Sequence, residues 1–124
     1  MEMKFYICEI CGNIIAMVKK SGAPVSCCGQ KMKELEPGTT DAAVEKHVPV
    51  FEVKDNKVLV TVGSVEHPML EEHYIEWIAV QTTAGNQRKA LKPGDKPQAC
   101  FALCDGEEIE AVYAYCNLHS LWKA

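Results

Sequence analysis

Residues 50–63 read VFEVKDNKVLVTVG, and this stretch favours a β fold. Valine and leucine alternate with polar residues on either side of Asp55-Asn56, which is the pattern of two strands that each bury one face. A two-residue Asp-Asn step between such runs is a signal for a tight hairpin turn. The stretch therefore predicts an antiparallel β-hairpin.

Further strand signals follow on the C-terminal side of this hairpin. Residues 74–82 are rich in aromatic and β-branched side chains and are followed by a turn signal at 84–86. Residues 98–103 and 108–115 flank a further turn signal at 105–106. Residues 65–73 contain proline and several charges, which favours a loop or a short helical turn. No long pattern with a helical period competes with these strands, so the sequence predicts an antiparallel sandwich or barrel.

The composition indicates an ordinary globular protein. The 124 residues are 48% hydrophobic and 24% charged, with a formal net charge of −4, which argues against a general nucleic-acid binder. The first twenty residues carry several charges and no apolar core of signal-peptide length. No stretch reaches the roughly 18 to 20 apolar residues that cross a bilayer. We therefore expect a cytoplasmic protein that does not enter a membrane.

Seven cysteines and four histidines are many for a chain of this size. They indicate either disulfides or metal sites, and a reducing compartment together with an odd cysteine count favours metals. Four of the cysteines fall within the first 28 residues, and the turn-rich residues 35–43 follow them as a linker. We expect a small metal knuckle over residues 1–36, too small to fold without a metal, and a β domain over residues 37–124.

The knuckle contains the motifs Cys8-x-x-Cys11-Gly and Cys27-Cys28-Gly. Four thiolates suit a tetrahedral iron or zinc ion, and the residues alone do not choose between these metals. Neighbouring side chains of an extended chain point to opposite sides, so Cys27 and Cys28 should strain such a tetrahedron. A redox-active Cys-x-x-Cys with two structural cysteines remains an alternative.

The β domain contains a second set of possible metal ligands. His47 precedes the first predicted strand, His67 and His73 flank a charged loop, and Cys116-x-x-His119 follows the last strand. Four imidazoles and one thiolate suit iron, which takes five or six ligands, better than zinc. An open sixth position would make this set a redox catalyst. Two further cysteines, Cys100 and Cys104, have apolar neighbours; we expect buried free thiols, with a cluster shared with Cys116 as the alternative.

These motifs together resemble the desulfoferrodoxin family, the two-iron form of superoxide reductase. The resemblance runs through the cysteine knuckle and then through EKHVP (45–49), GSVEHPM (63–69), HYIEW (73–77) and CNLH (116–119). The five motifs occur in the family's order along the whole chain. The family often has glycine where this chain has Ser120, a position that is not a ligand.

The resemblance implies a desulforedoxin-like FeCys4 domain without inorganic sulfide, followed by an immunoglobulin-like β-sandwich that carries a second iron. It implies equatorial binding of that iron by four histidines and axial binding by a cysteine, without haem. Transferred motif by motif, these ligands are His47, His67, His73, His119 and Cys116.

The implied activity is detoxification of superoxide by one-electron reduction to hydrogen peroxide, without release of dioxygen. Lys46 would attract superoxide and assist proton delivery, and Glu45 would close the sixth position in the ferric state. A rubredoxin-like protein would donate electrons, and we expect a homodimer.

Two other functions remain possible from the residues. An electron-transfer module would use the four-cysteine centre, with the histidines incidental. A zinc-binding interaction protein would hold both metals for structural reasons. Metal identity and metal content distinguish the three possibilities.

Overall fold

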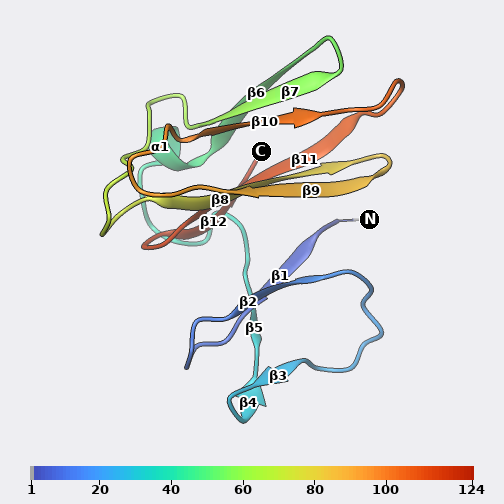
Figure 1. The fold of residues 1–124 in the computed structure, drawn as a ribbon. Helices are drawn as coiled ribbons and strands as arrows, with labels where there is room; N and C mark the ends of the chain where they lie inside the picture. The colour runs from blue at the N-terminus through green and yellow to red at the C-terminus, as the bar shows by residue number, and fades with distance from the viewer. Residues whose placement is uncertain (1) are drawn as a thin grey trace. The chain divides into compact units, whose positions relative to one another are not determined.

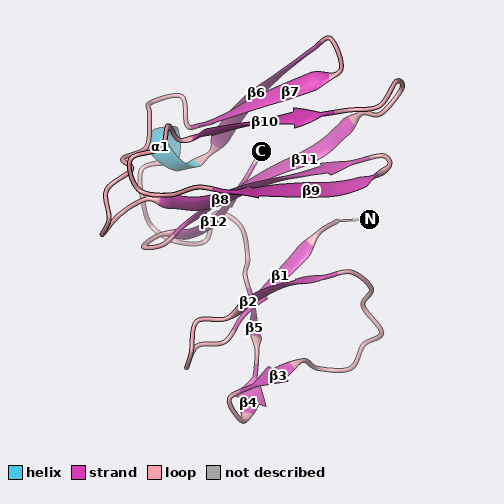
Figure 2. Cartoon of the chain, in the orientation of Figure 1, coloured by secondary structure: helices cyan, strands magenta, loops and turns pink. Residues whose placement is uncertain are grey.

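A computed structural model describes residues 2–124 of the chain. The chain divides into two compact units, the first ending at Glu36 and the second comprising Pro37–Ala124 (Figures 1 and 2). Each unit has its own strands and its own group of possible metal ligands. The architecture is mainly β, as the sequence predicts. Within the described residues, no helix is long and apolar enough to cross a bilayer.

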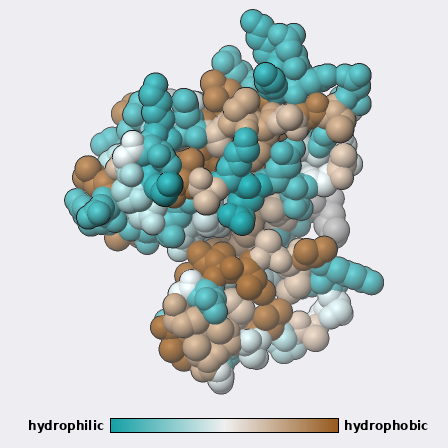
Figure 3. Space-filling model, in the orientation of Figure 1, coloured by the Kyte–Doolittle hydropathy of each residue, from teal (hydrophilic) through white to brown (hydrophobic). Residues whose placement is uncertain are grey.

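The first unit is a small knuckle of short strands. Its three-stranded sheet has the order β2-β1-β5, and β3 and β4 form a separate hairpin. The strands are β1 (Lys4–Ile7), β2 (Ile14–Met17), β3 (Ser26–Cys27), β4 (Gln30–Lys31) and β5 (Lys33–Glu34). Its buried apolar side chains are Phe5, Cys8 and Met32, whereas Ile10 and Val18 are exposed and apolar surface is visible on this unit (Figure 3). So small a core supplies little stabilisation, so the unit needs a further cross-link.

The second unit is a sandwich of two antiparallel sheets. One sheet has the order β10-β7-β6 and the other β12-β11-β8-β9. The elements are α1 (Val44–His47), β6 (Pro49–Lys54), β7 (Lys57–Val62), β8 (Ile75–Thr82), β9 (Gly85–Ala90), β10 (Gln98–Ala102), β11 (Ile109–Cys116) and β12 (Ser120–Lys123). Inward-facing residues of β7, β10, β8 and β11 form one core cluster between the sheets. Three strands packed on four correspond to the predicted immunoglobulin-like sandwich.

The hairpin that the sequence predicts is formed by β6 and β7. Lys54 pairs with Lys57, and the intervening Asp55 and Asn56 have φ values of 51° and 59°, the left-handed backbone of a tight hairpin turn. Val58, Val60 and Val62 of β7 face the core and are fully buried. Strand β6 lies at the edge of its sheet, and all its residues after Pro49 are exposed.

Three elements of the second unit were not predicted. Strand β9 has the polar sequence GNQRKA with exposed residues on both faces, so it carries no alternation of apolar and polar residues. Strand β12 and helix α1 have four residues each, too few for a period to emerge. The β8–β9 turn consists of residues 83 and 84, because Thr82 already pairs with Gly85.

The antiparallel pairings bring several chain segments to one end of the sandwich. Pro49 at the start of β6 pairs with Val62 at the end of β7, and Cys116 at the end of β11 pairs with both Ile75 and Ser120. Helix α1, the β7–β8 loop and the β11–β12 turn therefore gather at this end (Figure 1). The four histidines lie on these segments.

Candidate metal centres

Four imidazole rings surround a common point at this end of the sandwich. Taken in the order His47, His67, His73, His119, the ring centroids of neighbours are 4.6, 4.7, 5.1 and 4.9 Å apart, and their planes are 75–88° apart. His47 and His73 lie opposite each other, with centroids 6.4 Å apart and planes inclined by only 28°. The histidines thus form a closed four-membered ring.

The nitrogen atoms inside this ring have a spacing that a metal ion explains. The Nε2 atom of His47 lies 3.1 Å from Nε2 of His67 and 3.1 Å from Nδ1 of His119. With metal–nitrogen bonds of about 2.1 Å, two ligands at a right angle lie about 3.0 Å apart. The Nε2 atom of His73 is buried and has no hydrogen-bond partner among the described residues. A bound cation would satisfy all four nitrogens.

Backbone carbonyl groups orient two of the rings. Nδ1 of His47 lies 2.8 Å from the oxygen of Ala43, and Nδ1 of His67 lies 2.7 Å from the oxygen of Pro68. Each Nδ1 therefore donates its hydrogen to a carbonyl, which leaves Nε2 as the free acceptor. This tautomer directs the lone pair of Nε2 into the ring of histidines.

Burial also keeps these imidazoles neutral. It lowers the pKa of His67 to about 4, and it is the main cause of the lowered pKa values of His47 and His73. A neutral imidazole has a lone pair for a metal, whereas an imidazolium has none. At neutral pH these rings are therefore ready to bind a cation without first losing a proton.

Cys116 contributes a buried thiol to the same cluster. Its side chain is fully buried at the end of β11, and Sγ lies 3.7 Å from Nδ1 of His119. The donor atoms of His47, His67, His73 and Cys116 all lie within 4.8 Å of one another. Burial raises the pKa of the Cys116 thiol, so ionisation requires a compensating positive charge. A metal ion in the cluster supplies that charge.

Lys46 and Glu45 are carried by α1 next to His47. Both side chains are exposed. Burial is the main cause of the lowered pKa values of His47 and His73, the charges of neighbouring histidines contribute next, and the positive charge of Lys46 makes a smaller contribution. The backbone carbonyl of Glu45 is held by Val65 N–H at 2.9 Å and Ser64 Oγ at 3.2 Å.

Gly63 fixes the position of α1, a role that was not predicted from the sequence. A Cβ atom at residue 63 would lie 2.6 Å from the carbonyl oxygen of Glu45 and 2.9 Å from that of Val48. Only glycine permits this close approach between the β7 end and α1. The motif GSVEHPM contained the signal, but nothing in the sequence shows which segment lies against the glycine.

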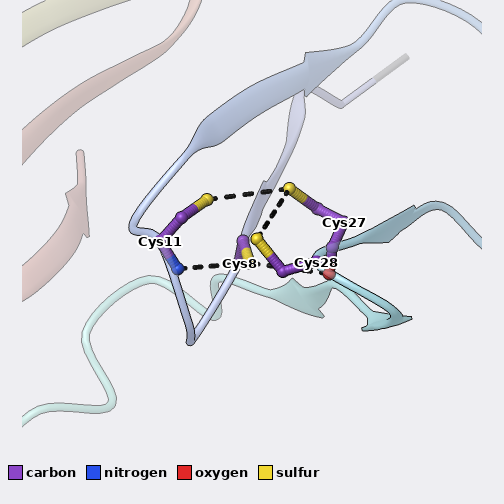
Figure 4. Close-up of side chains that lie close together, drawn as sticks. All are labelled: Cys8, Cys11, Cys27 and Cys28. Atoms are coloured by element: carbon purple, nitrogen blue, oxygen red, sulfur yellow. Dashed lines mark hydrogen bonds between the residues drawn. The ribbon is translucent and has the colours of Figure 1, made fainter.

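The four cysteines of the small unit form the second cluster. Their Sγ atoms lie within 4.8 Å of one another and point to a common centre (Figure 4). Cys27 Sγ lies 3.7 Å from that of Cys11 and 4.0 Å from that of Cys28. These distances exceed the roughly 2.05 Å of a disulfide and match the sulfur separation of about 3.8 Å in a tetrahedral site with metal–sulfur bonds near 2.3 Å.

The backbone of Cys28 explains how two adjacent cysteines reach one centre. Its φ value is 53°, and Gly29 follows with a φ of 76°. This left-handed step brings the Cys28 side chain to the same side as Cys27, against the alternation of an extended chain. The sequence predicted a strained metal tetrahedron at Cys27 and Cys28. In the structure the left-handed backbone conformation of Cys28 accommodates the adjacent cysteines instead.

The thiols of this cluster cannot all ionise by themselves. The Cys11 backbone N–H donates to Cys8 Sγ and is the main cause of a Cys8 pKa lowered to about 6. Hydrogen bonding to the Cys11 thiol instead raises the pKa of Cys28 to about 12 and is also the main cause of the raised pKa of Cys27. Without a cation Cys27 and Cys28 therefore keep their protons at neutral pH, and metal binding releases them.

The prediction for the remaining cysteines was wrong. Cys100 and Cys104 are exposed free thiols, not buried ones. Cys100 lies on β10 between the inward-facing Ala99 and Phe101, so strand alternation directs it outward, and Cys104 lies in the turn after β10. Neither residue belongs to the Cys116 cluster.

Ser120 stands where the family that the chain resembles often has glycine. It has a φ of 65°, in the left-handed region that favours glycine. The backbone of the β11–β12 turn therefore explains why glycine is common there, and serine accepts the same conformation.

Comparison with known proteins agrees with this geometry. The Desulfoferrodoxin family model matches residues 39–124, and the model of the desulfoferrodoxin N-terminal domain matches residues 1–35. A desulfoferrodoxin homolog from Archaeoglobus fulgidus is 51% identical, with 98% of this chain and 96% of the relative covered. The crystal structure of a superoxide reductase from Treponema pallidum is similar over 100% of this chain and 99% of that one, with a TM-score of 0.85 and 38% identity. A one-iron superoxide reductase from Giardia intestinalis matches 64% of this chain and 95% of its own, with a TM-score of 0.55 and 37% identity.

Proposed function

The chain belongs to the desulfoferrodoxin family, and on that premise we propose that it reduces superoxide to hydrogen peroxide. The observation that carries the proposal is the closed ring of four imidazoles with a buried thiol beside it. The proposed ligands of the catalytic iron are His47, His67, His73, His119 and Cys116. The overall reaction joins one superoxide, one electron and two protons into one hydrogen peroxide, so no dioxygen is released.

Iron bound in this cluster supplies the electron and an open coordination position for the oxygen substrate. The protein sets the properties of that position with its own side chains. Neutral imidazoles add no negative charge, so the cluster remains attractive to an anion. A Cys116 thiolate that held the iron would donate electron density to it, which would favour electron transfer to the substrate, the effect that a cysteine ligand has in some haem proteins.

Lys46 is the proposed guide for superoxide. The chain has a net charge of −4, which repels an anion at long range, so capture depends on local positive charge. Lys46 is placed to provide that charge, because it is exposed and directly precedes His47 in α1. We assign it attraction of the substrate and ordering of a proton-donating water as peroxide forms.

Glu45 is the proposed internal ligand of the oxidised site. A carboxylate oxygen is a hard donor that prefers the more highly charged ferric ion. Its carbonyl is anchored to Ser64 and Val65, while its side chain is exposed and able to move. The carboxylate would then occupy the open position after each reduction of superoxide and leave when the iron is reduced again.

The four-cysteine centre is proposed to carry electrons or to hold the small unit together. Four thiolates complete a tetrahedron and leave no position for a substrate. Cys11 and Cys28 are exposed, so a partner protein can approach this centre. We propose a rubredoxin-like one-electron donor and a cytoplasmic location, where thiolates stay reduced.

Strand β6 supports the proposal of a homodimer. It lies at the edge of its sheet, and the exposed fractions of Val50, Phe51 and Val53 are 42%, 42% and 53%. Phe51 and Val53 pair with Val60 and Val58, so they continue the core-facing side of the sheet without being covered. An exposed apolar edge strand is a template for pairing, and we propose a second copy of the chain as its partner.

The proposed function is tested by metal analysis and visible spectroscopy of the native protein. We expect two irons per chain, ferric tetrathiolate bands and a separate thiolate-to-iron band. Cys116→Ser should remove the separate band, keep the tetrathiolate bands and slow the reduction of superoxide in pulse radiolysis. A colourless zinc protein would support the structural alternative, and a single iron bound by the knuckle would support an electron-transfer module.

A further inference from the structure

Asn117 lies between two proposed ligands but offers no donor atom to either cluster. It follows Cys116 at the end of β11, is half-buried, and starts the turn that carries His119. Its hydrogen bonds connect the turn to a different part of the site.

Three hydrogen bonds join Asn117 to the chain on both sides of His73. The Asn117 N–H donates to the carbonyl of Tyr74 at 3.2 Å, and the Tyr74 N–H donates to Asn117 Oδ1 at 2.9 Å. Nδ2 of Asn117 donates to the carbonyl of Glu72 at 3.1 Å. The Asn117 side chain thus accepts a hydrogen bond from the residue after His73 and donates one to the residue before it.

The position of His73 depends on these three hydrogen bonds, whereas the rings of His47 and His67 have hydrogen bonds of their own. The rings of His47 and His67 are each fixed by a carbonyl at Nδ1, whereas among the described residues no such carbonyl bond holds the ring of His73. Within residues 2–124 the backbone of His73 is paired locally, with Leu70, at 2.9 and 3.1 Å. Next to the ladder pair of Ile75 with Cys116, the bonds of Asn117 connect this segment to the turn bearing Cys116 and His119.

We propose that Asn117 is a positioning residue that locks the His73 segment to the Cys116–His119 turn and thereby sets the spacing of the metal-binding atoms. The inference rests on the proposed function only in taking these residues as ligands. Asparagine suits the task because one short side chain provides both an acceptor and a donor. Aspartate keeps the acceptor alone, and leucine has a similar shape with neither.

The first test measures the clamp itself, by hydrogen exchange of the Tyr74 amide in the full-length protein, with and without metal. In Asn117→Leu this amide loses its acceptor, and we expect its exchange to become about tenfold faster. In Asn117→Asp the acceptor remains and exchange should stay close to wild type. Unchanged exchange in Asn117→Leu would overturn the clamp. The backbone bond from residue 117 to Tyr74 remains in each variant, which helps the turn to form.

The second test measures the consequence for the metal. Iron(II) titration of the histidine site should show affinity lowered roughly 10- to 100-fold in Asn117→Leu and less in Asn117→Asp, as for other residues that orient ligands. The thiolate-to-iron band should shift, because the spacing of Cys116 and His73 changes. Asn86, an exposed residue of β9, provides the matched controls Asn86→Leu and Asn86→Asp, which should leave both readouts unchanged.

The two tests separate the possible failures. Faster Tyr74 exchange with unchanged iron affinity and an unchanged band would make the clamp purely structural and would overturn the positioning role. Neither readout uses superoxide, so an inactive protein with the expected exchange and affinity changes would contradict the proposed function and leave the role of Asn117 supported.

Discussion

Replacing Gly63 by alanine would push helix α1 away from the end of β7. The new Cβ would lie 2.6 Å from the carbonyl oxygen of Glu45, whereas ordinary contact begins at 3.4 Å, so the two segments must separate by about 0.8 Å. The nearest obstacles are backbone atoms of α1 and Val48, which cannot rotate away as a side chain would. Overpacking of this kind costs about 1–3 kcal/mol.

The displacement also reaches the histidine ring. Helix α1 carries His47, whose Nε2 is 3.1 Å from nitrogens of both His67 and His119. A shift of several tenths of an ångström is large against a metal–nitrogen bond of about 2.1 Å. We therefore expect Gly63→Ala to lower the iron(II) affinity of the histidine site roughly 10- to 100-fold.

Urea unfolding and iron(II) titration measure the two effects separately. The four-cysteine centre is an internal control, because it lies in the other unit and should keep its spectrum. Ser64→Ala is the matched variant: it removes one hydrogen bond to the same Glu45 carbonyl without adding an atom near α1, and should cost about 1 kcal/mol or less. Unfolding free energy within about 0.5 kcal/mol of wild type, with unchanged iron affinity, would refute the steric argument for Gly63→Ala.

Three further predictions concern charge, assembly and pH. Lys46→Ala should slow superoxide capture about tenfold or more and flatten its dependence on ionic strength; an unchanged salt slope in pulse radiolysis would exclude steering. Phe51→Glu should convert a dimer to a monomer in analytical ultracentrifugation. A wild-type protein that is itself a monomer would contradict the proposed homodimer. Hydrogen bonds from Thr82 and from the Cys104 N–H lower the pKa of Glu107, so its contribution to stability is present above pH 4.5 and is lost as pH falls through the lowered value. Glu107→Gln should therefore be less stable than wild type at pH 7, with a difference that shrinks on acidification; a constant difference in thermal melts would contradict this assignment.

Alternation made most of the sandwich predictable from the sequence. Val58, Val60 and Val62 occupy every second position and all face the core, so one run of residues identified a strand and its buried side. Strand β9 was not predicted, because its residues are polar and mostly exposed on both faces of the sheet. The same alternation could have placed Cys100 on the surface, because Phe101 next to it is buried. The apolar neighbours of Cys100 led to the prediction that it is buried. Adjacent side chains of a strand point to opposite faces, so buried neighbours instead indicate that Cys100 is exposed.

The site was predictable as a set of residues but not as an arrangement. Histidine and cysteine types indicate which side chains can bind a metal, and the family motifs group them. The sequence does not show that His47 lies opposite His73, or that the backbone near α1 packs directly against Gly63. Asn117 was missed for the same reason, since its importance comes from bonds to a segment 43 residues away. Local sequence patterns predict which residues are ligands, whereas tertiary contacts determine how those ligands are arranged.

The distribution of the ligands along the chain has a consequence for biosynthesis. The four cysteines of the knuckle are complete once residue 28 has been made, whereas the histidine ring joins His47 to His119 across 72 residues. Long-range contacts of this kind form late, because a large loop must first be closed. On the ribosome the two metals would therefore be acquired in order, the knuckle first.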